Sequence, residues 1–213
     1  MSIVKRFFNQ TRKPEGPLGN MMLRSMNSGH ARLADWGLLH LPEIDVDNAV
    51  DLGCGAGRNA AALLQKYPDA HISAVDYSPL SVEKSKQYNK DMILRGRCRV
   101  MLGDVSDLKL PDESFDLATA FETIYFWPGL ERCFSQVARI LKPGGYFMIC
   151  NESDGTDFTG KRFEKIIDGM TCYTAPKIEE ALKNSGFSEV TREHHPSKPW
   201  ITLIARKNIL MRK

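Results

Sequence analysis

Three glycines at alternate positions could bring backbone amides close to a bound ligand. They are Gly53, Gly55 and Gly57. An apolar segment, 49–52, precedes them, and a segment with a helical pattern, 58–67, follows. Glycine lacks a Cβ, so a turn of this kind lets the main chain approach a ligand closely. Because a strand, a glycine turn and a helix form half of a nucleotide-binding βαβ unit, the sequence predicts a ligand site here.

Acidic residues stand at or just beyond the ends of apolar segments that we predict to be strands. Ligands of parallel sheets bind outside the carboxyl ends of the strands, so these side chains would share one edge. Asp51 lies beside the glycine turn, where an anion disfavours a pyrophosphate but suits a cationic ligand. The acidic series is Asp51, Asp76, Asp104, Glu122 and Glu152.

Two common nucleotide motifs do not fit this turn. The dinucleotide fingerprint requires Gly-x-Gly-x-x-Gly or Ala, and counted from Gly53 its last position falls on Arg58. The Gly-Lys-Ser or Gly-Lys-Thr of a phosphate-binding loop is absent from the sequence. These mismatches disfavour a nicotinamide-dependent oxidoreductase, which we keep as an alternative.

Alternating strand and helix patterns predict the framework that would position these residues. Such alternation implies an α/β fold with a mostly parallel sheet and helices on both faces. We predict strands over residues 49–52, 71–75, 97–102, 115–120, 146–150, 190–193 and 200–205. We expect residues 1–45 to form an N-terminal helical cap or lid, with one helical stretch over 20–41, and residues 46–213 to form the main domain.

Composition disfavours several classes of protein. Lys and Arg total 29 against 26 Asp and Glu, and the net charge of +3 does not indicate a nucleic-acid partner. Five widely spaced cysteines without a C-x-x-C pair indicate neither a disulfide framework nor a zinc site, and we predict no metal. No signal peptide and no apolar run of membrane-spanning length are evident. We therefore expect a cytoplasmic protein with reduced cysteines and no membrane partner. The sequence indicates no particular oligomeric state.

Four segments resemble, in order and spacing, those of the class I S-adenosylmethionine (SAM)-dependent methyltransferases of the methyltransferase-11/25 type. They are residues 50–57, 74–78, 103–105, and 115–122 together with 141–145. The resemblance implies a Rossmann-like sheet of seven strands with the last one antiparallel, which the final predicted hairpin fits. It also implies SAM as cofactor, S-adenosylhomocysteine (SAH) as its product and methyl transfer as the activity. A non-catalytic SAM-binding protein stays open as an alternative.

The resemblance assigns cofactor contacts to the acidic strand ends. Asp76 would accept hydrogen bonds from both ribose hydroxyls. Asp104 is either the acceptor for the adenine amino group or a turn residue, and Tyr77 either packs on adenine or covers the sheet edge. Asp51 would orient the turn amides or meet the SAM ammonium through water. The cofactor set implied is Asp51, Gly53, Cys54, Gly55, Gly57, Asp76, Tyr77, Asp104, Val105 and Phe121.

The acceptor side has one candidate catalytic residue. Glu122 would be a general base, a substrate clamp, a partner for the SAM ammonium or a structural residue. Residues 121–124 lack the Pro-Pro motif of enzymes that methylate nucleobases or glutamine, which disfavours those acceptors. We therefore expect a small-molecule acceptor in a mostly apolar pocket. The candidate substrate contacts are His30, Tyr125, Glu152 and Tyr173.

Overall fold

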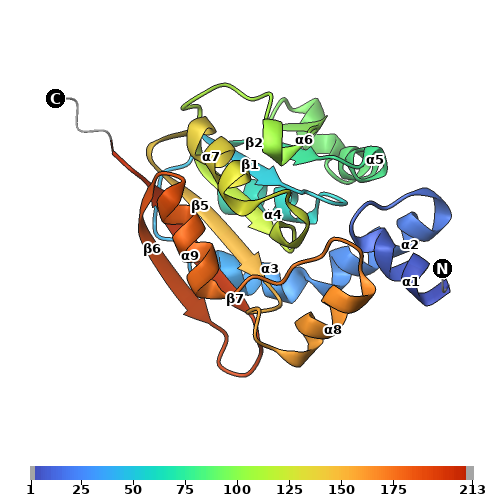
Figure 1. The fold of residues 1–213 in the computed structure, drawn as a ribbon. Helices are drawn as coiled ribbons and strands as arrows, with labels where there is room; N and C mark the ends of the chain where they lie inside the picture. The colour runs from blue at the N-terminus through green and yellow to red at the C-terminus, as the bar shows by residue number, and fades with distance from the viewer. Residues whose placement is uncertain (1–2, 210–213) are drawn as a thin grey trace.

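Seven strands form one sheet in the computed structural model, which describes residues 3–209 (Figure 1). They are β1 (Asn48–Leu52), β2 (His71–Asp76), β3 (Cys98–Leu102), β4 (Phe115–Phe121), β5 (Leu141–Asn151), β6 (Phe187–His194) and β7 (Ile201–Lys207). The strand order is β3-β2-β1-β4-β5-β7-β6. β7 runs antiparallel to both neighbours, whereas the pairings from β3 to β5 are parallel. The predicted sheet, mostly parallel with an antiparallel last strand, is therefore confirmed.

Apolar side chains alternate along the strands, so the sheet buries a core on each face. Val50 and Leu52 of β1 belong to one core, and Ala49 belongs to the other. Residues of α7 and α9 complete the first core, and residues of α3, α4 and α5 complete the second (Figure 1). These helices are α3 (Ala31–Leu38), α4 (Arg58–Lys66), α5 (Pro79–Tyr88), α7 (Leu130–Ile140) and α9 (Ala175–Asn184).

Local signals in the sequence mark several element boundaries. Ser78 caps α5, because its Oγ accepts a hydrogen bond from the N–H of Ser81 at 3.3 Å, and Pro79 takes the first helical position. β5 begins at Leu141 rather than at the predicted position 146. The reason is a register shift that lets Leu141 pair with Phe115 ahead of the main ladder.

The helical stretch predicted over residues 20–41 is divided into two helices. Two helices, α2 (Gly16–Gly29) and α3, cover most of this stretch and meet at His30, whose backbone has φ −92° and ψ 2°. Gly29 has a low helix propensity, which explains a break at this point. α3 lies directly on the sheet, because a Cβ added to Gly37 would come within 2.6 Å of a β5 side chain.

Short elements complete the chain. They are α1 (Ile3–Phe8), η1 (Asn9–Thr11), α6 (Lys90–Leu94), η2 (Val105–Asp107), η3 (Ile124–Phe126) and α8 (Phe158–Ile166). α1 and α8 lie side by side although they are far apart in the sequence (Figure 1): the rings of Phe8 and Phe163 are 5.5 Å apart, centroid to centroid. Among residues 3–209, no helix combines the length and the apolar character that a membrane crossing requires.

Candidate active site

A cavity of about 380 Å³ lies at the carboxyl ends of β1, β2 and β4 and is closed on one side by α2. Leu23 and Met26 are the apolar side chains that α2 contributes to its lining. Of the ten residues that the sequence predicts as cofactor contacts, eight line this cavity; the exceptions are Asp51 and Gly57. The structure therefore brings together most of the predicted cofactor set.

The glycine turn adopts a backbone that glycine tolerates and other residues rarely adopt. Gly53, Gly55 and Gly57 have φ values of 79°, 51° and 88°. The N–H groups of Gly53 and Cys54 donate to the carbonyl oxygen of Val75 at 2.8 and 3.0 Å, which joins the turn to β2. A Cβ added to Gly55 would meet nothing nearer than 4.0 Å. The turn thus presents an open main-chain cradle to the cavity.

Asp76 joins this cradle to the start of α5. Its Oδ2 accepts a hydrogen bond from the N–H of Gly55, and its Oδ1 accepts one from the N–H of Ser78, both at 2.9 Å. Burial raises the pKa of Asp76, and these hydrogen bonds oppose the rise. A carboxylate oxygen has two lone pairs, so the side chain is fixed at the cavity wall with acceptor capacity left for a ligand.

Asp104 and Tyr77 line the cavity and also hold the surrounding chain. Asp104 Oδ1 accepts hydrogen bonds from the N–H and the hydroxyl of Ser106, both at 2.8 Å, and so caps η2. The ring of Tyr77 is exposed at the cavity rim, and its hydroxyl donates to the carbonyl oxygen of Arg12. Asp104 therefore acts as a turn residue, one of its two predicted roles. Tyr77 links the N-terminal segment to the end of β2.

Asp51 and Gly57 lie behind the cavity wall. Asp51 Oδ1 accepts a hydrogen bond from the hydroxyl of Thr119 at 2.9 Å, and its Oδ2 has no partner in the part of the chain that the structure describes. Burial raises the pKa of Asp51 to about 7; the bond from Thr119 opposes this rise and the charge of Asp76 adds to it. The carbonyl oxygen of Gly57 accepts a hydrogen bond from Asn89 Nδ2 at 2.9 Å. Orienting the turn amides was one of the two roles predicted for Asp51, but the N–H of Gly55 donates to Asp76 instead.

Glu122 lies at the other end of the cavity, directly after β4. Its φ of 60° is unusual for a residue other than glycine, and its N–H donates to the carbonyl oxygen of Cys150 at 3.0 Å. Its Oε1 accepts hydrogen bonds from the hydroxyl of Tyr125, at 3.1 Å, and from the N–H of Glu152. Burial raises the pKa of Glu122 to about 7; His30 opposes this rise and the charge of Glu152 adds to it.

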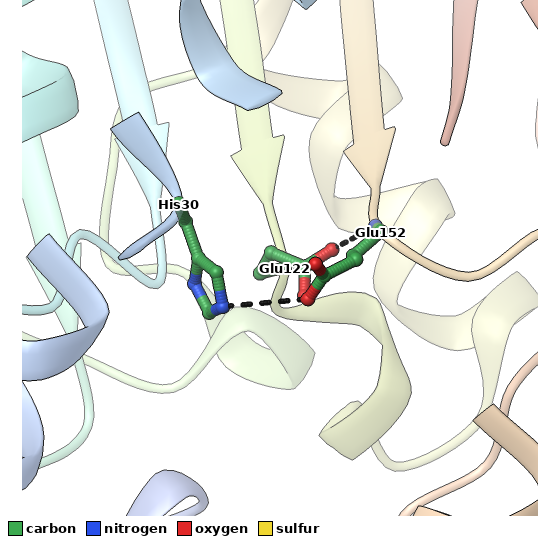
Figure 2. A group of neighbouring side chains, drawn as sticks. All are labelled: His30, Glu122 and Glu152. Atoms are coloured by element: carbon green, nitrogen blue, oxygen red, sulfur yellow. Dashed lines mark hydrogen bonds and ion pairs between the residues drawn. The ribbon is translucent and has the colours of Figure 1, made fainter. Parts of the chain in front are cut away.

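Three side chains from distant segments meet at this end (Figure 2). His30 lies between α2 and α3, Glu122 follows β4, and Glu152 follows β5. His30 Nε2 is 3.7 Å from Glu152 Oε2, and one nitrogen or oxygen atom of each residue lies within 4.8 Å of the others. Such a group could also hold a metal ion, which the sequence does not predict.

The four predicted substrate contacts take different positions. His30 lines the cavity. Tyr125 is buried behind Glu122, and Glu152 reaches the site through its contacts with Glu122 and His30. Tyr173 is outside the lining and packs against the core that α7 and α9 share. The prediction for Tyr173 therefore has the least geometric support.

Residues 50–149 match the family model described as a methyltransferase domain. The matched residues are a methyltransferase domain of the class I SAM-dependent family. The chain is 30% identical over 147 residues to sterol methyltransferase-like 2 of Botryococcus braunii, a match that covers 65% of this chain and 38% of that protein. It is 33% identical over 153 residues to sterol 24-C-methyltransferase ERG6B of Gibberella zeae, covering 68% and 40%. The chain spans half or less of the length of the curated relatives it matches.

Solved structures share this methyltransferase fold. A chain from a Haloferax volcanii complex with the Trm112 methyltransferase activator superposes with a TM-score of 0.82, 18% identity and coverage of 98% of this chain and 99% of that one. A SAM-dependent methyltransferase from Thermotoga maritima superposes with a TM-score of 0.73 and 20% identity, and the match covers 96% of this chain and 100% of that one. A third neighbour is geranyl diphosphate C-methyltransferase from Streptomyces coelicolor, solved with Mg²⁺, a substrate analogue and SAH. It superposes with a TM-score of 0.69 and 14% identity, and the match covers 83% of this chain and 76% of that one. At these identities the likeness establishes the fold.

Most of the N-terminal wall of this cavity was not predicted from the sequence. Arg12, Leu23 and Met26 line the cavity although no motif singles them out. Besides the bond from Tyr77 to Arg12, the hydroxyl of Ser78 donates to the carbonyl oxygen of Pro14 at 3.1 Å. The spacing of Leu23 and Met26, three residues apart on one helix face, is the signal that could have indicated this wall.

Proposed function

We propose that this protein binds SAM in the cavity and transfers its methyl group to a small-molecule acceptor. The observation that carries the proposal is the convergence of the glycine cradle and Asp76 on one cavity at the carboxyl ends of β1 and β2. Ligands of open α/β sheets bind where the strand order reverses, and here it reverses between β1 and β4. Family membership and the SAH in a solved neighbour support the choice of cofactor.

The residues present fit this cofactor. Gly55 leaves room for close approach to the main chain, and Asp76 keeps acceptor capacity for the ribose hydroxyls. Asp104 uses Oδ1 for its turn, so its Oδ2 would accept from the adenine amino group. SAM supplies a methyl group made electrophilic by the adjoining sulfonium. Leu23 and Met26 would exclude water from that group.

Glu122 would serve the acceptor. It lines the cavity, and the bonds from Tyr125 and Glu152 fix its carboxylate in place. In this position it would bind the acceptor or take a proton from it at a carboxylate oxygen. Phe126 and Trp127 also line the cavity, and a concave site that joins apolar side chains to polar ones suits a small molecule. We do not propose a sterol as the acceptor, because this chain spans half or less of the length of the sterol methyltransferases it resembles.

We propose that the cap of residues 1–45 works as a lid on the domain of residues 46–213. α3 is packed on β5, so the part free to move would be α2 and the segment before it. SAH would order this part over the site. We expect amide hydrogen exchange within residues 14–38 to slow on addition of SAH, with the change in α2 and the residues before it rather than in α3. Unchanged exchange there, with protection at residues 53–57, would show that the cap is only structural.

We place the protein in the cytoplasm. Its five cysteines are free and buried, which suits a reducing compartment. Cell fractionation with an antibody to the chain tests this assignment.

Calorimetry and label transfer together test the proposed activity. We expect SAM and SAH to bind the purified chain, NADH not to bind, and methyl-labelled SAM to label a component of small-molecule extracts. The transfer assay is needed because a [4+2]-cyclase, SpnF, is also a structural neighbour, with a TM-score of 0.69. Absence of SAM and SAH binding would refute the proposal. Efficient labelling of RNA or protein, with none in the metabolite extracts, would refute the acceptor class.

A further inference from the structure

We propose that the methyl acceptor is a small amine, held as its ammonium ion between the carboxylates of Glu122 and Glu152. This inference rests on the proposed methyl transfer and adds the class of acceptor. It follows from the charge, the geometry and the size of the acceptor end of the cavity.

The charge at this end favours a cationic acceptor. Two carboxylates and one imidazole lie within 4.8 Å of one another, and the charges that act most strongly on Glu122 are those of His30 and Glu152. A carboxylic acid or a phenol would have to react as an anion beside this pair, where like charges repel. An ammonium ion is instead attracted to both carboxylates.

The geometry places the two carboxylates at the edge of the cavity: Glu122 lines it, and Glu152 lies just outside its lining, within 4.8 Å of Glu122 and His30. Glu122 Oε1 is held by the hydroxyl of Tyr125 and by the N–H of Glu152, so Oε2 is the oxygen available to a ligand. His30 Nε2, at 3.7 Å, holds Glu152 Oε2 near the same point. Trp127 lines the same cavity, and an aromatic face attracts a cation both before and after methylation.

The proton and electron movements balance with the groups present. The ammonium N–H bond breaks and its proton passes to the Glu122 carboxylate, which leaves a lone pair on nitrogen. That pair forms the N–CH₃ bond while the S–CH₃ bond breaks, and the bonding electrons stay on sulfur. The sulfonium becomes the neutral thioether of SAH, and the product is a methylated ammonium ion. Glu122 suits the first step because burial raises its pKa to about 7, close to neutral pH.

The size of the cavity favours a small acceptor. Its volume of about 380 Å³ lies near the lower end of the roughly 300–1,000 Å³ found for pockets that hold one drug-sized ligand. SAM is itself such a ligand, so little space is left for its partner. The space left beside SAM in this cavity is too small for a sterol.

Binding to the SAH-loaded full chain tests the inference. The probes are phenethylamine, phenethyl alcohol and phenylacetate, which share a ring and differ in the terminal group. We expect the amine to bind at least about tenfold more tightly than either analogue. Glu152→Gln keeps the backbone N–H that donates to Glu122. This variant should bind the amine about tenfold more weakly than the parent, with the same affinity for SAH. Glu43→Gln, at an exposed residue outside the cavity lining, is the matched control and should bind like the parent.

The outcomes separate this inference from the proposed function. Loss of SAH binding in the parent chain would refute the proposed function. Intact SAH binding with no preference for the amine, or an equal preference in Glu152→Gln, would overturn the amine assignment alone. Mn²⁺ binding that requires Glu152 and is not displaced by the amine would assign the cluster to a metal ion and also overturn it.

Discussion

The two ends of the cavity are built in different ways. The cofactor end uses one short turn, in which Gly53 and Gly55 bind the end of the neighbouring strand through main-chain amides. The acceptor end uses side chains from three separate segments, and its group forms only when β4, β5 and the junction of α2 with α3 are in place. The first end is therefore defined by local sequence, and the second by how the junction of α2 with α3 lies against the sheet.

Each end also contains a carboxylate whose pKa is raised to about 7, and the two differ in access. Asp51 is shut behind the cavity wall with Oδ2 unpartnered among residues 3–209, whereas Glu122 opens onto the cavity. The same rise in pKa thus weakens the fold at Asp51, whereas at Glu122 it would suit the proposed proton acceptor. Variants at the two ends should separate turnover from binding and stability.

The largest expected effect is on turnover at the acceptor end. Glu122→Gln should lower kcat by about a hundredfold, because general acid–base groups typically contribute about that much or more. The affinity for SAM should stay within about twofold of the parent. Label transfer measures kcat and calorimetry measures affinity, with Glu43→Gln as the control. Parent-like turnover in a folded Glu122→Gln variant would remove Glu122 from the mechanism.

At the cofactor end, Gly57→Ala should reduce the free energy of unfolding by about 1–3 kcal/mol through backbone strain. The added Cβ would also lie 2.5 Å from Ser85 Oγ and 2.9 Å from Ser85 Cα. Urea unfolding measures the change. Gly29→Ala is the matched control, since its Cβ meets nothing within 4 Å, and it should stabilise the chain by about 0.4–1 kcal/mol. Equal stability of Gly57→Ala and the parent would contradict the packing described.

Asp76→Ala should weaken SAM binding by about tenfold or more, because hydrogen bonds to a charged group contribute roughly 1.5–3 kcal/mol each. Asp69→Ala, at an exposed turn residue, is the control. Calorimetry gives both affinities, and circular dichroism shows whether each variant is folded. Equal SAM affinity in a folded Asp76→Ala variant would exclude Asp76 from the cofactor site.

The smallest expected effect is a pH dependence of stability that arises at Asp51. Its pKa rises from 3.8 to about 7 on folding, so the folded chain binds this proton more tightly than the unfolded chain. Stability from this group is present below about pH 4 and is lost as the pH rises through about 7. Asp51→Asn should remove a fall in the free energy of unfolding on the order of 1 kcal/mol between about pH 6 and pH 8. Identical pH profiles for the parent and Asp51→Asn would show that Asp51 does not titrate in this way.

The sequence predicted the parts of the molecule that depend on local pattern. The mostly parallel sheet follows from the alternation of strand and helix patterns, and its seven strands with an antiparallel last strand follow from the family resemblance. The break at His30 did not follow, because a single glycine is a weak signal inside a helical pattern. The contact between His30 and Glu152 could not be predicted from the sequence either, because it depends on how α2 and α3 pack against the sheet.

The left-handed backbone at Glu122 has a consequence for other members of the family. Glycine or asparagine would adopt a φ of 60° with less strain than glutamate, so selection for a stable chain alone would favour them here. We therefore expect the side chain, and not the backbone, to account for a glutamate at this position. Homologues that carry glycine or asparagine here should retain the nucleotide-binding half of the molecule while having given up its acidic chemistry, which makes position 122 a marker for sorting the family by acceptor.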